Sequence, residues 1–317
     1  MTTLTWRLHR SQVYMSAAAV ASLTALLLAT GIAMAATYHA FLATCAAAHT
    51  CADGHSLLFR GDGILNDLAY ATMAVPLLFG LFWGAPLLAG EFEAGTHSLA
   101  WTQGISRRSW LTGTIGWALA AAAGWGAAVT ALVTWWRLPE NALGLPHVGF
   151  DTGTFDIQGF VPVAYSVFAV ALGIAAGGVF RRLLPAMAAT LAAFAGLRFV
   201  IAEYARPHYL TPVSKIVPLT LSSGAPANAW VLSSGAIGPN GQNAPGYSFT
   251  MANIPATCRS DIGHLTSCLS AQGWHSQVIY QPATRFWAFQ GIEAGIFIVL
   301  AAALIALACG LVLTRDA

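Results

Sequence analysis

The chain has 317 residues, of which 57% are hydrophobic and 8% are charged, whereas about a quarter of an ordinary soluble domain is charged. Because so few charges cannot cover the surface of a water-soluble fold of this length, the composition excludes a soluble protein. The net charge of +2 is small and spread along the chain, so no basic stripe indicates nucleic-acid binding.

Six apolar stretches are each long enough to cross a bilayer. A bilayer core needs about 20 apolar residues in helical form, and unpaired backbone groups are too costly in lipid for open structures. The fifth stretch is the weakest, because it contains Arg198. We therefore predict an all-α integral membrane protein with six transmembrane helices. The stretches are Val13–Ala36, Leu68–Gly90, Trp110–Trp136, Val161–Phe180, Leu183–Ala202 and Phe286–Leu313.

Arginines at the ends of these stretches set the predicted orientation. Cytoplasmic loops carry an excess of arginine and lysine, and an even number of crossings leaves both termini on one side. We therefore expect a multi-pass protein of the cell membrane with both termini in the cytoplasm. The first stretch is longer than a typical signal-peptide core, so we expect it to remain as a helix. The arginines of the cytoplasmic side are Arg7, Arg10, Arg107, Arg108, Arg181, Arg182 and Arg315.

Two pairs of cysteines fall in loops of the opposite side. Cys45 with Cys51 and Cys258 with Cys268 are close in sequence, which suggests two disulfides in an oxidising compartment; unpaired thiols are the alternative. The second pair lies in residues 204–285, which are rich in Ser, Gly, Pro and Asn and are expected to form a small extracellular cap. Within the cap, a Gly-Pro-Asn-Gly turn at residues 238–241 predicts a β-hairpin of residues 230–235 and 247–251.

Motifs of several enzyme classes are missing from the sequence. The sole lysine, Lys215, lies between Ser214 and Ile216, so the chain has no Walker A loop to bind ATP. It also has no His-Glu-x-x-His pair and no Gly-x-Ser-x-Gly elbow. The histidines at 39, 49 and 55 could bind metal, but a solvated, disulfide-closed loop is the simpler interpretation. We expect no catalytic residue, no metal and no cofactor on this chain.

The most informative segment, residues 91–109, lies between the second and third stretches. It reads Glu-Phe-Glu-Ala-Gly-Thr from Glu91, continues through a short amphipathic run, and reaches Arg107 and Arg108 before Trp110 re-enters the bilayer. A threonine after a glycine break can cap a new short helix. Its apolar side chains would then lie along the membrane surface.

This segment resembles the permease subunits of type-2 ABC exporters, particularly their actinobacterial branch. In that family, Glu-x-Glu-x-Gly-Thr after the second span begins the cytoplasmic coupling helix that touches the ATPase subunit. Thr5–Arg10 is similar to the family's interfacial N-terminal helix, and six spans with a long outer segment before the last also fit. The resemblance implies that the contact with the ATPase involves Glu91, Phe92, Glu93, Gly95, Thr96, His97, Leu99, Trp101, Gln103, Arg107 and Arg108.

The function that the resemblance implies is ATP-driven export. This chain would be the membrane-spanning subunit, and it would move an amphipathic or hydrophobic compound outward by alternating access. Two ABC ATPase subunits would bind ATP and magnesium, and a second copy or a related permease chain would complete the complex in membrane lipid. By domain, residues 1–203 would hold helices one to five with the coupling segment, 204–285 the cap, and 286–317 helix six and a short tail.

Charged and aromatic side chains within the stretches are candidates for the substrate path, which the resemblance places between helices two and five. At 1.5 Å per residue, Arg198 and Glu293 lie at comparable depth in the outer leaflet, and charges in lipid are costly. We therefore expect the two to pair or to share a polar network; separate snorkelling to the headgroups is the alternative. For the aromatic stripe of helix two, ordinary core packing or lipid contact is the alternative and the more common role. The candidates are Phe79, Phe82, Trp83, Phe194, Arg198 and Glu293.

Paired glycines four residues apart on helices two, four and six predict close helix contacts.

Two other functional classes remain open at this point. One is a membrane-embedded enzyme that acts at the outer face through the outer histidines. The other is a non-transporting membrane scaffold or immunity protein.

Overall fold

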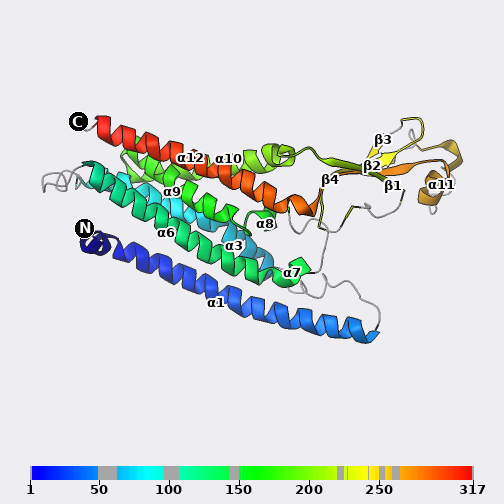
Figure 1. Cartoon of the computed structure of the whole chain (residues 1–317), viewed down its shortest axis with the longest axis horizontal. Helices are drawn as coiled ribbons and strands as arrows, with labels where there is room; N and C mark the ends of the chain where they lie inside the picture. Colours follow the sequence, from blue (N-terminus) through cyan, green and yellow to red (C-terminus); the bar gives the residue numbers. More distant parts are fainter. Residues whose placement is uncertain are drawn as a thin grey trace. The chain divides into compact units, whose positions relative to one another are not determined.

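The computed structural model describes residues 2–48, 63–95, 107–142, 150, 152–219, 225–226, 228–241, 243–249, 254–258 and 265–315. Within these residues, six helices are long and apolar enough to cross a membrane (Figure 1). This confirms the predicted class, an all-α membrane protein with six spans, whereas the cytoplasmic placement of the termini stays a prediction. The spans are Ala17–Cys45, Asp67–Ala94, Arg108–Trp136, Val161–Phe180, Leu183–His208 and Ala283–Thr314.

The chain divides into two compact units. We call the first the helical unit; it comprises Met1–Leu143, Thr152–Ala202 and Gln290–Ala317. We call the second the sheet unit; it comprises Gly144–Asp151 and Glu203–Phe289.

The first helix, α1 (Thr2–Ala48), extends well beyond the predicted end at Ala36. Its last third is rich in alanine, the best helix former, so His39 and Cys45 lie in the helix and not in a loop. Residues 49–62 lie outside the described residues, so the Cys45–Cys51 disulfide and the histidine cluster stay predictions. Among the described residues, no group of three His, Cys, Asp or Glu side chains is placed to hold a metal ion.

The second span consists of α3 (Gly63–Phe79), a π-helical turn η1 (Gly80–Gly84) and α4 (Ala85–Ala94). It packs along the most buried span, α9 (Val161–Phe180). A Cβ atom added to Gly173 would lie 2.4 Å from the Gly80 carbonyl oxygen, and one added to Gly80 would lie 2.6 Å from the Ala169 carbonyl oxygen. The predicted glycine contacts of helices two and four are therefore present, and they face each other. A Cβ atom added to Gly291 or Gly295, the helix-six pair, would meet no described atom within 4 Å outside its own stretch of helix.

The remaining helices of the helical unit complete its core around α9. They are α6 (Arg107–Trp136), α7 (Leu138–Ala142), α8 (Thr152–Phe155), α10 (Leu183–Val200), and the part of α12 (Phe286–Arg315) from Gln290 onward. Trp83, Leu111 and Ile174 lie in one buried cluster. A second cluster joins α1 to α3 and α6, and there the indole nitrogen of Trp136 donates to Thr30 Oγ1 at 3.0 Å.

The sheet unit contains an antiparallel sheet of four strands in the order β1-β4-β2-β3. The predicted hairpin is present, but its second strand comes earlier in the chain than expected. Gly241, at φ +77°, closes the turn by donating to the Gly238 carbonyl at 3.1 Å, and the chain pairs again at once. The strands are β1 (Val213–Pro218), β2 (Trp230–Ile237), β3 (Asn243–Pro245) and β4 (His275–Gln281).

Short helical turns make up more of the sheet unit, and the first of them begins in the helical unit. They are η2 (Ile201–Ala205), η3 (Arg206–His208), η4 (Ala256–Cys258), α11 (Leu265–Ala271) and η6 (Ala283–Arg285). The Cys258–Cys268 disulfide joins η4 to α11, as the spacing predicts. It closes a small apolar core that contains Leu219, Leu269 and Trp274.

Candidate functional site

The first feature of the site is the end of α4, where the predicted coupling segment begins. Gly95 adopts φ +67° and its N–H donates to the Phe92 carbonyl at 3.3 Å. Glycine adopts this left-handed conformation without steric cost, and it commonly ends helices in this way. The helix therefore breaks at the glycine of the Glu-x-Glu-x-Gly-Thr motif. The chain is described again from Arg107 in α6, with an exposed Arg108; Thr96, His97, Leu99, Trp101 and Gln103 lie outside the described residues.

The end of α4 is joined to the start of α10. Glu93 Oε2 accepts a hydrogen bond from the Leu183 N–H at 2.9 Å. We call this contact the Glu93–Leu183 clasp. Leu183 is the first residue of α10, and its N–H has no acceptor within its own helix. A carboxylate is also electrostatically favoured at a helix N-terminus. The clasp therefore links two spans that are far apart in sequence.

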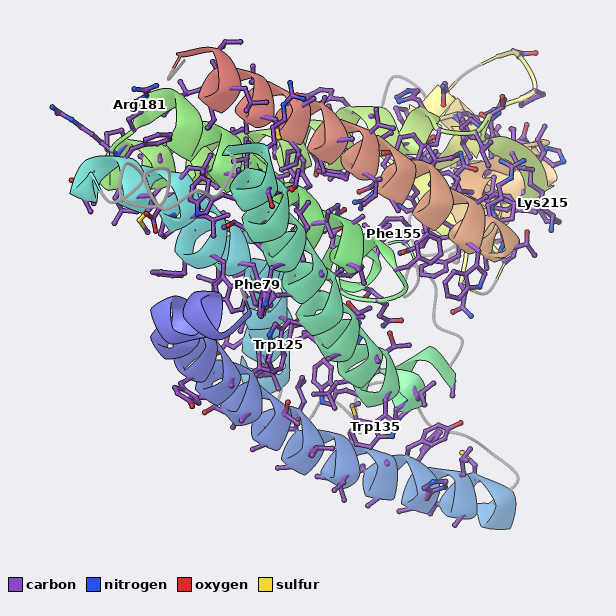
Figure 2. The ribbon with its side chains drawn as sticks, turned by 60° about the vertical axis from the view of Figure 1, so that its left-hand side comes forward. Phe79, Trp125, Trp135, Phe155, Arg181 and Lys215 are labelled. Carbon is purple, nitrogen blue, oxygen red and sulfur yellow. A yellow bond between two sulfur atoms is a disulfide. The ribbon has the colours of Figure 1, made fainter. Side chains whose placement is uncertain are left out.

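A second contact lies beside the clasp. The Arg181 guanidinium carbon lies 5.0 Å from the centroid of the Phe92 ring, within the range of a cation–π interaction. Arg181 ends α9 at φ +53°, and its N–H donates to the Gly177 carbonyl at 2.9 Å. Figure 2 labels Arg181 at this end of the helical unit. Phe92 and Glu93, which the resemblance implicates in ATPase contact, thus hold the α9–α10 turn within the chain.

The second feature is an apolar pocket of about 680 Å³ in the helical unit. The three aromatic residues predicted for helix two all line it, and Figure 2 labels one of them, Phe79. Of the lining side chains, only Trp83 carries a polar atom, and none is charged. Leu183, the residue held by the clasp, contributes to the same wall. The lining residues are Ala19, Val20, Leu23, Ala71, Val75, Leu78, Phe79, Phe82, Trp83, Pro86 and Leu183.

The third feature is a buried polar network, separate from the residues that line the pocket. Arg198 forms an ion pair with Asp156, and its guanidinium lies 4.4 Å from the centroid of the Tyr165 ring. The Tyr165 hydroxyl lies 3.1 Å from Asp156 Oδ1 and also forms a hydrogen bond with Glu293. Asp156, Tyr165 and Glu293 are each at most 1% exposed. Arg198 and Glu293 therefore share one network, but the direct carboxylate partner of Arg198 is Asp156.

Gln290 holds the segment that carries Asp156. Its amide nitrogen donates to the Phe155 carbonyl at 3.1 Å, and its amide oxygen accepts from the N–H groups of Phe160 and Val161 at 3.2 and 3.0 Å. Gly159, at φ +73°, allows this approach, because a Cβ atom there would lie 2.6 Å from the Gln290 amide oxygen. Gln290 thus satisfies the first N–H groups of α9.

The predicted substrate-path residues fall into two places. Phe79, Phe82 and Trp83 line the pocket, whereas Arg198 and Glu293 lie in the network and Phe194 stacks on Phe168 at 6.1 Å between ring centroids. Sequence analysis missed Asp156, Tyr165 and Gln290. The spacing of Gln290 and Glu293, three residues apart on one helix face, is the signal that was present for Gln290.

Comparison with known protein families gives a match. Residues 17–206 match a family model described as ABC-2 membrane transporter related. The match covers more than half of the chain and extends from the start of the first span into the fifth. No curated protein and no solved structure matches the chain.

Proposed function

Because the chain belongs to the ABC-2 membrane transporter-related family, we propose that it is the membrane-spanning subunit of an ATP-driven exporter. The family and the six apolar helices make it a multi-pass membrane protein of the permease type. The observation that carries the proposal is the apolar pocket lined by Phe79, Phe82 and Trp83, on the same span that ends at the Glu91–Gly95 break. The cargo is an amphipathic or hydrophobic compound.

Partner subunits supply the ATP site. With no Walker A loop in the chain, ATP and magnesium bind to two ABC ATPase subunits, which dock on the segment of residues 91–109. A second copy of this chain, or a related permease, completes the complex. ATP binding then moves the coupling segments, and the path between helices two and five opens outward. The cargo must bind the inward and outward states with different affinity for transport to be driven.

The proposed orientation puts the coupling segment and both termini in the cytoplasm. The arginines at 107, 108, 181 and 182 support it, since they flank one end of the spans and cytoplasmic flanks are rich in arginine. The sheet unit with its disulfide then lies on the extracellular side, which is an oxidising compartment.

Copurification of an ATPase tests the proposal. The full chain is expressed together with its neighbouring reading frames and purified through a tag on the chain. The sample is then tested for a copurified Walker A protein and for ATP hydrolysis. We expect stoichiometric recovery of the ATPase, and severalfold less recovery with Glu91→Ala or Trp101→Ala. Asp67→Ala, an exposed acid at the other end of the same span, is the control. Recovery of no ATPase would favour the non-transporting scaffold.

A further inference from the structure

Leu183 takes part in both the clasp and the pocket. Its backbone N–H is held by Glu93, and its side chain lines the pocket with Trp83 and Pro86. Trp83, Pro86 and Glu93 all belong to the continuous run of η1 and α4. One residue therefore connects the break that precedes the coupling segment to the wall of the pocket.

The α9–α10 turn is short, and its hydrogen bond to α4 is exposed. Only Arg181 and Arg182 separate the two helices. Arg181 is in the left-handed region and Arg182 is extended, at φ −135° and ψ 138°. The clasp itself is exposed, so water can replace the Leu183 N–H when the end of α4 shifts. Residues at the ends of helices commonly absorb the backbone changes of hinge motions, and Arg181 and Arg182 occupy such positions.

On the basis of the proposed function, we propose that the Glu93–Leu183 clasp links the coupling segment to the occupancy of the pocket. With the clasp closed, Leu183 forms one wall, and a ligand in the pocket stabilises the closed state. When the coupling segment draws the end of α4 away, the clasp breaks, Leu183 leaves the wall and the ligand binds less tightly. The linkage is reciprocal. If the closed clasp raises the affinity of the pocket for the ligand, the bound ligand stabilises the closed clasp by the same free energy. Glu93 is a positioning residue that does not itself touch the ligand.

The lining also defines the chemical class of the ligand. A pocket of about 680 Å³ lies within the range that holds small molecules. Because no lining side chain is charged, an ionised group inside it would lose its hydration without gaining a partner. The part of the cargo that enters is therefore neutral and apolar, and an amphipathic cargo keeps its polar part outside.

Hydrogen exchange at the Leu183 amide tests this inference directly. The amide is the first of α10, so Glu93 supplies its protection. The full chain in nanodiscs, without any ATPase, is compared with and without the neutral apolar fluorophore N-phenyl-1-naphthylamine. We expect the probe to slow exchange at Leu183 about fivefold in the parent chain. In Glu93→Ala, exchange should be fast and insensitive to the probe, and Asp67→Ala should behave like the parent chain.

Probe affinity, read from its fluorescence in the same samples, gives a second measurement. Glu93→Ala and Leu183→Pro should each weaken binding about fivefold. Proline fits the first turn of a helix, and the extended Arg182 suits a following proline. Because proline removes the leucine side chain of the wall together with the N–H, Glu93→Ala is the variant that tests the clasp alone. Phe82→Ala should also weaken binding, because Phe82 lines the pocket.

Three outcomes would overturn the inference: no probe binding, bound probe without slower exchange at Leu183, or probe-sensitive exchange in Glu93→Ala. Since no ATPase is present in these samples, these outcomes are separate from failure of the copurification. If the chain binds no ATPase but the probe still slows exchange at Leu183, the inference about the clasp holds and the export proposal fails.

Discussion

Arg198 carries a charge within a membrane-spanning helix, and Asp156 makes that placement possible. A charge surrounded by apolar groups is costly unless it is paired and hydrogen-bonded. Here the guanidinium has the Asp156 carboxylate as its partner and the face of the Tyr165 ring beside it. Tyr165 then extends the network to Glu293 on another helix. The network thereby ties α9, α10 and α12 together inside the helical unit.

The pairing of Arg198 with Asp156 predicts non-additive losses of stability. Removing one partner of a buried pair leaves the other uncompensated, at a cost of about 3–5 kcal/mol. We expect Arg198→Ala and Asp156→Ala each to lower the thermal unfolding temperature of the purified chain, and the double variant to lose clearly less than the sum. Tyr165→Phe removes a hydroxyl that contacts two buried carboxylates and should cost about 1.5–3 kcal/mol. Strictly additive losses in the double variant would contradict the pairing.

Depth along a helix could be predicted for these residues, but their immediate partners could not. The rise per residue placed Arg198 and Glu293 at one level, and the cost of charge in lipid required that they find partners. Asp156 lies in a short non-helical stretch before α9. In such a stretch, no periodicity in the sequence indicates which way a side chain points. Sequence analysis therefore did not identify Asp156 as a partner of Arg198. Only the three-dimensional course of residues 152–160 brings it to Arg198.

At the scale of elements, the contact between the second span and α9 depends on glycine. Gly173 approaches Gly80 and Ala85, and Gly177 approaches Ala85 and Ala89, all through backbone atoms. Backbone atoms cannot move aside as a flexible side chain can. Because η1 carries Phe82 and Trp83 of the pocket, this contact also fixes the position of its wall.

Alanine at Gly173 should therefore destabilise the fold. Its Cβ atom would lie 2.4 Å from the Gly80 carbonyl oxygen, and overpacking of this kind costs about 1–3 kcal/mol. We expect a lower unfolding temperature and less monodisperse protein from Gly173→Ala. Gly116→Ala is the matched control, because nothing lies within 4 Å of that position in α6 and alanine favours helix. Equal behaviour of the two variants would show that the close contact is not maintained.

The type and number of the spans could be predicted, whereas their neighbours could not. The six apolar stretches correspond to six helices, and the first differs mainly because alanine continues the helix through His39 and Cys45. The same glycine spacing occurs on helices two, four and six. It marks a contact between helices two and four. A Cβ atom added to Gly291 or Gly295 of helix six would meet no described atom of another element within 4 Å. A spacing shows that a face permits close approach, not which element approaches it.

At the scale of the whole molecule, composition predicts a membrane protein. In the sheet unit, the hairpin and the disulfide could be predicted, but the strand order could not. β1 pairs with β4 across more than fifty intervening residues, and β4 lies between β1 and β2 in the sheet. Such non-local pairing leaves little local trace in a sequence. The turn at Gly241 and the two cysteines were readable because each acts locally, through a positive φ or a short spacing.

Labelling of intact cells tests the orientation on which the export proposal depends. In a Cys309→Ser background, which removes the free thiol of α12, an impermeant maleimide should react with Ile216→Cys in intact cells. Ile216 is 64% exposed on β1 of the sheet unit. Ala94→Cys, exposed at the end of α4, should react only after the membrane is permeabilised. The background chain without added cysteines is the control. The opposite pattern would place the Glu91–Gly95 break outside the cell, away from ATP, so no ATPase could act on the clasp from that side.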